Sequence, residues 1–219
     1  MTIEREIAQI LLSLGAVSLR TDPPFTWASG RLAPIYCDNR LIMSDPNHRK
    51  TVACGFQTLL ESRGLRPDVI AGTATAGIPH AAWLADITGL PMVYIRSQAK
   101  GHGKQNQVEG VLKSGQSVVL IEDLISTGGS SIEAAKGVID AGGNLLCVAA
   151  IFSYELDVAA RKFEDAKIEF ATLTGFAALL AAAQEMGMLR PDELSTLADW
   201  RIDPAAWSEA RKRAQPNRF

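Results

Sequence analysis

Apolar side chains recur at helical spacing in the first fifteen residues of the chain. They occupy positions Ile3, Ile7, Ile10, Leu11 and Leu14. A period of three to four residues is typical of one face of an amphipathic α-helix, and Gly15 follows where such a helix would stop. The opening segment is therefore predicted to be a helix that packs one face against the rest of the protein.

From residue 46 to about residue 155, short apolar runs alternate with amphipathic segments. Helices are expected at residues 46–63, 79–87 and 131–141, and strands at residues 69–72, 91–96, 117–123 and 145–152. The expected strands are apolar along their whole length, which is typical of a parallel sheet covered on both faces. This order predicts an α/β fold, with a central, mainly parallel sheet flanked by helices.

The two ends of the chain do not follow this alternation. Residues 22–39 combine prolines, a glycine and aromatic residues without periodicity, which predicts an irregular loop with a short strand at residues 35–37. From about residue 175 the pattern becomes helical again. No repeat of 20 to 50 residues is visible.

Composition limits the classes of function. The chain has 219 residues, of which 47% are hydrophobic and 21% charged, as in one globular domain. A net charge of -2 provides no overall attraction for nucleic acid or a membrane surface, so we expect neither as a partner. Three widely spaced cysteines favour neither disulfides nor zinc. Without a signal peptide or spanning stretch, a cytoplasmic location is expected.

The strongest chemical signal is the apolar run of residues 118–121, which is followed by Glu122 and Asp123 and then by a Thr-Gly-Gly-Ser turn at residues 127–130. Glycines and a helix N-terminus together make a cradle for a monophosphate. A capping box from Ser130 to Glu133 would also explain the turn as a simple helix start. It would not explain two carboxylates at the end of a buried strand, which need cations or hydroxyls as partners.

This segment resembles the motif of type I phosphoribosyltransferases that binds phosphoribosyl pyrophosphate (PRPP). It lacks the Gly-Lys-Ser/Thr of a nucleotide-binding P-loop and the GxGxxG of dinucleotide-binding proteins. The resemblance implies that the two acids hold the ribose and that the turn holds the 5-phosphate. The implied PRPP-binding residues are Glu122, Asp123, Leu124, Ile125, Ser126, Thr127, Gly128, Gly129 and Ser130.

A second signal is the polar stretch that runs from Arg96 to Gly110 and carries Lys100 and His102 between glycines. A polar segment of this length is typical of a lid or of a solvated loop. Its cations suit a pyrophosphate leaving group. The stretch resembles the flexible catalytic loop of orotate phosphoribosyltransferases, which implies that Arg96, Lys100 and His102 contact PRPP, that Lys100 and His102 act in catalysis with Asp123, and that a homodimer shares the loop.

Two further segments fit the same resemblance. The first follows the strand at residues 69–72 and consists of Thr73, Ala74, Thr75, Ala76 and Gly77. In the family this loop holds the pyrophosphate through backbone donors; a plain strand-to-helix turn is the alternative. The second, residues 25–40, resembles the N-terminal signature of orotate enzymes, which purine enzymes lack. It implies a hood over the base.

The implied domain organisation is one phosphoribosyltransferase domain over residues 1–219. Residues 1–40 and about 175–219 would form the small hood and its flanking elements, and residues of about 41–174 the PRPP-binding core. Three residues depart from the family pattern. Gln98 stands where a second loop lysine is usual, Ala28 replaces a lysine found before Ser-Gly in some relatives, and Ala33 replaces the usual serine before Pro34. The predicted pyrophosphate clamp is therefore less positive than in those relatives.

The resemblance implies a pentosyltransferase that joins orotate to the ribose 5-phosphate of PRPP, giving orotidine 5′-monophosphate and pyrophosphate in pyrimidine biosynthesis. Ser126 would bind orotate, and Mg²⁺ would be held mainly through PRPP without a dedicated set of protein ligands. Two alternatives remain: a phosphoribosyltransferase for another base, and a regulatory PRPP sensor. Sensors usually add a basic nucleic-acid-binding element, which this chain lacks.

Overall fold

The computed structural model describes residues 2–97 and 107–214. Its centre is a six-stranded sheet in the order β10-β9-β8-β5-β6-β7. Neighbouring strands are parallel except for β7, which pairs antiparallel with β6 at the edge. The strands are β5 Val69–Thr73, β6 Met92–Ile95, β7 Val108–Glu109, β8 Ser117–Ile125, β9 Asn144–Ser153 and β10 Phe170–Gly175. The predicted α/β fold is confirmed.

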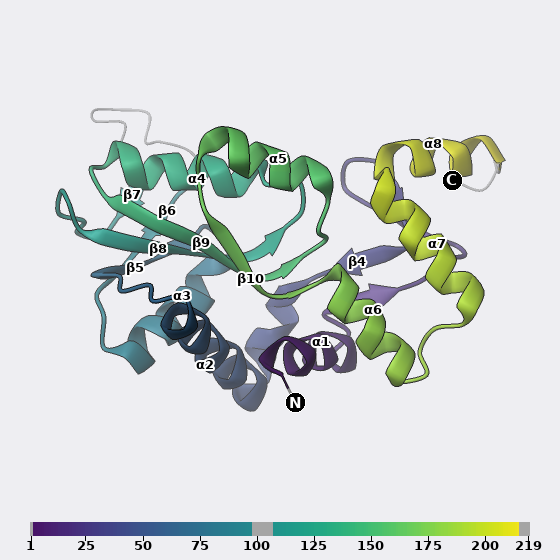
Figure 1. Cartoon of the computed structure of the whole chain (residues 1–219), viewed down its shortest axis with the longest axis horizontal. Helices are drawn as coiled ribbons and strands as arrows, with labels where there is room; N and C mark the ends of the chain where they lie inside the picture. The colour runs from purple at the N-terminus through teal and green to yellow at the C-terminus, as the bar shows by residue number, and fades with distance from the viewer. Residues whose placement is uncertain (1, 98–106, 215–219) are drawn as a thin grey trace.

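Two layers of helices cover the sheet, as Figure 1 shows. Helices α2 (Pro46–Ser62) and α3 (Gly77–Thr88) lie on one face, and α4 (Gly129–Asp140) and α5 (Asp157–Ala166) on the other. Successive side chains of β8 enter opposite layers: Val119 and Ile121 join one apolar cluster and Val118 and Leu120 the other. Burial on both faces explains why the strands are apolar throughout.

Local signals set the helix ends. Helix α1 (Ile3–Ser13) ends before Gly15, which has a φ of 67°, so the predicted opening helix is confirmed. Asp45 caps α2 by accepting hydrogen bonds from the backbone N–H groups of Asn47 and His48. The predicted helices near residues 79 and 131 begin two residues earlier, at Gly77 and Gly129.

Three elements between residues 46 and 175 escaped the sequence analysis, namely β7, α5 and β10. Short strands at residues 17–19, 25–26 and 32–33 and a 3-10 helix at residues 39–44 were not predicted either. Strand β7 is only two residues long and lies inside the polar stretch. Strand β10 leads directly into helix α6 (Phe176–Glu185), so its apolar residues are continuous with those of the helix.

The terminal segments pack together at one end of the sheet (Figure 1). We call residues 17–44 and 176–214 the terminal layer. It contains β1 (Val17–Leu19), β2 (Phe25–Thr26), β3 (Leu32–Ala33), β4 (Ile35–Cys37), the 3-10 helix η1 (Asn39–Ser44), α6, α7 (Pro191–Ile202) and α8 (Pro204–Ala214). Strand β1 pairs with β4, and β2 pairs with β3. The strand predicted at residues 35–37 is therefore confirmed.

Aromatic packing joins the terminal layer to the sheet. The Trp27 ring stacks on Tyr154, directly after β9, with centroids 5.4 Å apart. Trp200 of α7 meets both rings edge-on, at 5.8 and 5.5 Å. The backbone N–H of Leu32 donates to the Ser208 hydroxyl at 2.9 Å, which holds α8 against β3.

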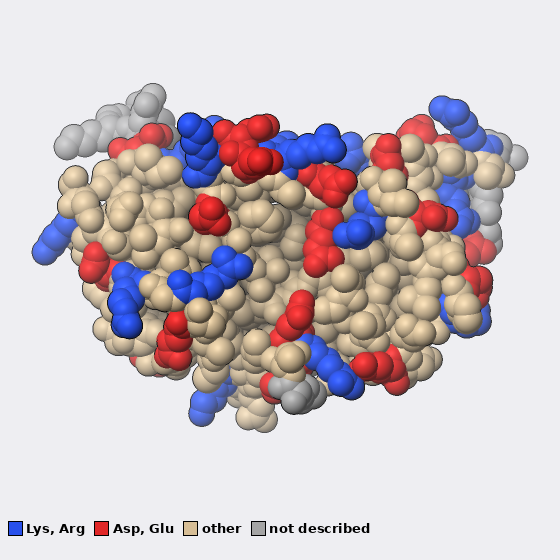
Figure 2. Space-filling model, viewed as in Figure 1, with Lys and Arg blue, Asp and Glu red and all other residues tan. Residues whose placement is uncertain are grey.

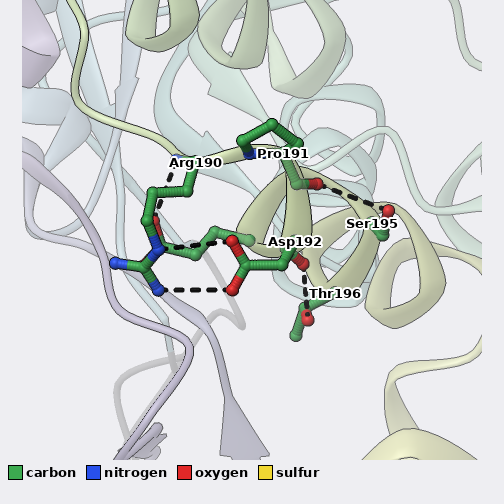
Figure 3. A network of polar contacts seen from close by, with 6 residues as sticks. Arg190, Pro191, Asp192, Ser195 and Thr196 are labelled. Atoms are coloured by element: carbon green, nitrogen blue, oxygen red, sulfur yellow. Dashed lines mark hydrogen bonds and ion pairs between the residues drawn. The ribbon is translucent and has the colours of Figure 1, made fainter.

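The polar network in Figure 3 starts helix α7. The Arg190 guanidinium donates two hydrogen bonds to the Asp192 carboxylate, at 3.2 and 3.3 Å, and the Arg190 N–H donates to Glu193 at 3.0 Å. These exposed contacts cap a helix. They lie outside the cleft described below.

Charges are dispersed over the surface. On the face in Figure 2, basic and acidic side chains are interspersed. Within residues 2–97 and 107–214, no helix has both the length and the apolarity needed to cross a bilayer.

Candidate active site

A cleft of about 430 Å³ opens at the carboxyl ends of β5, β6 and β8, where a doubly covered parallel sheet places its ligands. Twelve of the predicted site residues line it: Thr73, Ala74, Thr75, Ala76, Arg96, Glu122, Asp123, Leu124, Ser126, Thr127, Gly128 and Ser130. Segments that are about fifty residues apart in sequence therefore meet in one cavity.

Three of the other predicted site residues, Gly77, Ile125 and Gly129, do not line the cleft. Lys100 and His102 lie outside the described residues. Four residues that were not predicted to lie in the cleft also line it: Ile95, Ser97, Glu133 and Ala134. They lie close in sequence to predicted residues, and this proximity is the sequence feature that could have identified them.

The carboxylate of Glu122 is buried between the two turns that form the cleft. One of its oxygens accepts hydrogen bonds from the Thr73 hydroxyl at 2.7 Å and from the Asp123 N–H at 3.0 Å, and the other accepts from the Ser131 hydroxyl at 3.1 Å. Thr73 ends β5, and Ser131 lies in the first turn of α4. Glu122 thus ties the loop after β5 to the start of α4.

Burial, a hydrogen bond with the Asp123 carboxyl and the charge of Asp123 raise the pKa of Glu122 to about 7, although the Thr73 hydroxyl lowers it. A buried carboxylate beside another acid favours the protonated form. The apolar run predicted a strand that ends at the two acids, but β8 continues to Ile125. The hydroxyls of Thr73 and Ser131 that contact Glu122 were not predicted.

The turn at residues 127–130 owes its shape to Gly128. This residue has a φ of 76°, in the left-handed region, and a Cβ there would lie 3.0 Å from the Phe163 ring of α5. Gly128 is the N-cap of α4, and no side chain caps that helix. The capping box considered for Ser130 and Glu133 is therefore wrong. The free N–H groups of the first turn are suited to a phosphate.

The loop after β5 is fixed by backbone contacts. Its Ala74–Thr75 peptide bond is cis, and the Ala74 N–H donates to the Ile95 carbonyl at 2.8 Å. Gly77 begins α3 directly against the Ile121 carbonyl and the Thr73 hydroxyl, leaving no room for a side chain. Gly77 thus allows α3 to approach β8, while residues 73–76 face the cleft.

Arg96 places a cation at the cleft where β6 ends. Its guanidinium lies 3.3 Å from the Glu109 carboxylate of β7, and its backbone N–H donates to the Gln107 carbonyl at 2.9 Å. The edge hairpin of β6 and β7 therefore holds Arg96 in position.

The terminal layer contacts the same site through Asn39. This fully buried side chain donates a hydrogen bond to the Asp123 carbonyl at 2.6 Å. Burial and then the charge of Asp123 raise the pKa of the neighbouring Cys37 thiol. Asn39 falls within the segment that resembles the orotate signature, but only the three-dimensional structure reveals its partner 84 residues away.

Potential metal ligands are few. Within the described ranges, no three His, Cys, Asp or Glu side chains are grouped as a metal site. The acids that line the cleft are Glu122, Asp123 and Glu133, and the first is already occupied by hydroxyls.

Comparisons with known proteins agree with this geometry. The model of the phosphoribosyl transferase domain matches residues 46–174. Orotate phosphoribosyltransferase of Enterococcus faecalis is 50% identical over 207 residues, 94% of this chain and 99% of that protein. The enzyme of the same name from Oceanobacillus iheyensis is 52% identical over 199 residues, 91% of this chain and 98% of that one.

Solved structures of the family share the fold of this chain. The crystal structure of orotate phosphoribosyltransferase from Aeropyrum pernix has a TM-score of 0.72 and 25% identity, covering 84% of this chain and 99% of that chain. The chain therefore belongs to the phosphoribosyltransferase family and, within it, to the orotate phosphoribosyltransferases.

Proposed function

We propose that this chain transfers the 5-phosphoribosyl group of PRPP to orotate, giving orotidine 5′-monophosphate and pyrophosphate. The observation that carries the proposal is the meeting of two anion-binding turns, residues 73–76 and 126–130, in one cleft with Asp123 between them. Two turns match the two phosphate ends of PRPP, and the acid matches the ribose.

The turn at residues 127–130 would hold the 5-phosphate through backbone N–H groups at the start of α4. The loop at residues 73–76 and Arg96 would hold the pyrophosphate from the opposite side of the cleft. Lys100 and His102 are assigned to the same group through the family motif; they would add positive charge where the leaving group becomes more negative.

Asp123 would act on the ribose. As the bond from C1 to the pyrophosphate breaks, positive charge develops on the sugar ring, and a nearby carboxylate stabilises it. The bond from C1 to the orotate nitrogen then completes the transfer, so no protein nucleophile is needed. Glu122 would contribute chiefly by holding the two turns at the correct separation, through Thr73 and Ser131.

The scarcity of acidic ligands fits a magnesium ion that takes most of its oxygen ligands from PRPP and water. Asp123 and Glu133 line the cleft and are the acids placed to contact its hydration shell. When bound, Mg²⁺ would neutralise charge on the pyrophosphate.

We assign the base to the side of the cleft that faces the terminal layer. Ser126 would donate a hydrogen bond to orotate. Tyr36 is 42% exposed, and its ring centroid lies 5.8 Å from that of Phe25. It precedes the half-buried Cys37, whose thiol pKa is raised in part by the charge of Asp123. An aromatic residue in this position suits a planar base. In this proposal the terminal layer is the hood of a single domain.

We further propose a cytoplasmic homodimer in which Arg96 serves its own cleft and the loop that follows it, with Lys100 and His102, serves the neighbouring subunit's cleft. The loop connects β6 to the edge strand β7, so it starts at the border of the sheet. Sedimentation of the purified protein would test the dimer.

The experiment is to follow orotate absorbance after adding the protein, PRPP and Mg²⁺, with adenine, hypoxanthine and uracil in parallel. Loss of orotate alone, abolished by omitting PRPP or by chelating Mg²⁺, is the expected result. Turnover of a purine would assign a different base to the same fold. PRPP binding without turnover of any base would indicate a sensor and overturn the proposal.

A further inference from the structure

Orotate differs from uracil by one carboxylate, so an enzyme that selects orotate needs a cation beside the base. A charged hydrogen bond to that carboxylate rewards orotate, and the same cation is left unpaired with uracil. This requirement rests on the function proposed above. Ala28, in the segment that resembles the orotate signature, supplies no such charge.

Few of the described arginine and lysine side chains lie where they could contact the carboxylate of the base. The base must lie against the ribose, and therefore near Asp123 and Ser126. Arg96 belongs to the pyrophosphate side and is paired with Glu109. In the terminal layer, the Arg20 guanidinium lies 4.2 Å above the Phe25 ring. Arg31 lines a neighbouring cleft, of about 650 Å³, between α5 and α7, which meets the active-site cleft at Thr127, on the phosphate side.

Arg40 has the required position. It follows Asn39, whose side chain is anchored on the Asp123 carbonyl at 2.6 Å, so the arginine starts beside the ribose carboxylate. Asp38 raises the pKa of the Arg40 guanidinium most, and the charges of Tyr36 and Asp123 add to this effect. Arg40 therefore shares its surroundings with the aromatic residue assigned to the base and the acid assigned to the ribose.

The partner that Arg40 has in this structure is itself a carboxylate. Its Nε and Nη2 atoms donate to the two oxygens of Asp38, at 2.6 and 2.9 Å, in the two-pronged geometry that arginine forms with planar carboxylates. Within the described part of the chain, its Nη1 makes no hydrogen bond. Arg40 is thus exposed enough to reach a ligand and already oriented by a group like the one on orotate.

We propose that Arg40 is the residue that determines specificity for orotate, with its guanidinium binding the carboxylate of the base. The Nη1 edge would bind it while Asp38 holds the opposite edge. Asp38 thereby acts as a positioning residue. Uracil, which has no carboxylate, would gain nothing from this contact.

The test compares Arg40→Gln, Arg40→Lys and the matched control Arg190→Gln, an exposed arginine of the terminal layer that also donates two hydrogen bonds to an aspartate, Asp192. For each variant we would measure KM for orotate, KM for PRPP and the ratio of kcat/KM for orotate over uracil. Thermal unfolding would establish that each variant is folded.

Loss of one charged hydrogen bond should raise the KM for orotate about 10- to 100-fold in Arg40→Gln. The KM for PRPP should stay within about twofold, and the orotate-to-uracil ratio should fall by the same factor as orotate binding. Arg40→Lys should be intermediate and Arg190→Gln unchanged. Unchanged orotate KM and base ratio in Arg40→Gln would overturn the assignment. A wild-type protein without orotate turnover would instead overturn the proposed function.

Discussion

The core cleft and the terminal layer are held together by different physical means. In the core, the groups that face the cleft are held by backbone geometry: a left-handed glycine at residue 128, a helix start without a side-chain cap, and a buried carboxylate between two hydroxyls. In the terminal layer, the contacts with the sheet are made by side chains: aromatic rings stack on one another, and Asn39 donates a hydrogen bond to the Asp123 carbonyl.

Under the proposed function, this difference indicates which part of the chain selects PRPP and which part selects the base. A phosphate is recognised by several N–H groups of one short turn, so the core can serve any enzyme that uses PRPP. A base is recognised at its edges by side chains contributed from distant segments. Changes in the core should therefore affect PRPP for every base, whereas changes in the terminal layer should affect the choice of base.

The largest expected effect is that of Asp123→Asn. Removing the charge beside a ribose that becomes positive in the transition state should lower kcat about 10²- to 10³-fold. Steady-state kinetics with saturating PRPP and orotate would measure it. Asp140→Asn, at the far end of α4, is the matched control and should leave kcat unchanged. An Asp123→Asn enzyme with near-normal kcat would remove this carboxylate from the mechanism.

Gly128→Ala should damage the phosphate turn and the fold together. The left-handed conformation costs alanine about 1–2 kcal/mol, and the new Cβ would lie 3.0 Å from the buried Phe163 ring. We expect a loss of at least about 2 kcal/mol in unfolding free energy, measured by denaturant titration.

Gly129→Ala provides the matched comparison for stability. A Cβ at Gly129 meets only the Lys162 ammonium group, at 3.9 Å, and alanine is favoured in a helix by up to about 1 kcal/mol. The Gly129 variant should be as stable as the wild type or slightly more so. Equal destabilisation by both substitutions would contradict the role given to the left-handed turn.

Glu122→Gln should alter how stability depends on pH. Because folding raises the pKa of Glu122 from its ordinary 4.5 to about 7, its stabilising contribution is complete below pH 4.5 and is lost as the pH rises through 7. The unfolding free energy of the wild type should therefore fall by about 2 kcal/mol more than that of Glu122→Gln between pH 5 and 7.

Denaturant titrations at several pH values would measure that difference, with Glu164→Gln, on the exposed side of α5, as the control. The Glu164 variant should keep the pH dependence of the wild type. If Glu122→Gln also kept it, the buried carboxyl would not be the titrating group.

The smallest expected effect is that of Asn39→Ala, which removes the hydrogen bond between the terminal layer and Asp123. Loss of this one neutral hydrogen bond should cost about 1 kcal/mol of unfolding free energy, with a rise in the KM for orotate. Asn144→Ala removes an exposed hydrogen bond to Ser117 and should cost less than about 0.5 kcal/mol. Similar losses in the two variants would show that the link at Asn39 is unimportant.

Much of the core was predictable because its signals are local. The strands are continuous apolar runs, and the PRPP motif is a contiguous stretch whose backbone forms the binding turn, so the motif located most of the cleft from sequence. Helix starts were wrong by two residues because the glycines at 77 and 129 begin helices without a capping side chain.

The features of the fold and the cleft that could not be predicted depend on contacts between segments that are distant in sequence. The hydroxyls of Thr73 and Ser131 reach Glu122 only after β5 and β8 pair, and Asn39 reaches Asp123 only after the terminal layer packs on the sheet. Strand β7 owes its existence to pairing with β6, because two residues have too little pattern of their own.

The most direct test of the division between core and terminal layer is a calorimetric titration of PRPP and Mg²⁺ into three proteins: wild type, Gly128→Ala and Arg40→Gln. The account predicts that PRPP binds Gly128→Ala at least about tenfold more weakly than wild type and binds Arg40→Gln with wild-type affinity. Equal weakening in both variants would mean that the terminal layer also holds PRPP, which would contradict the division.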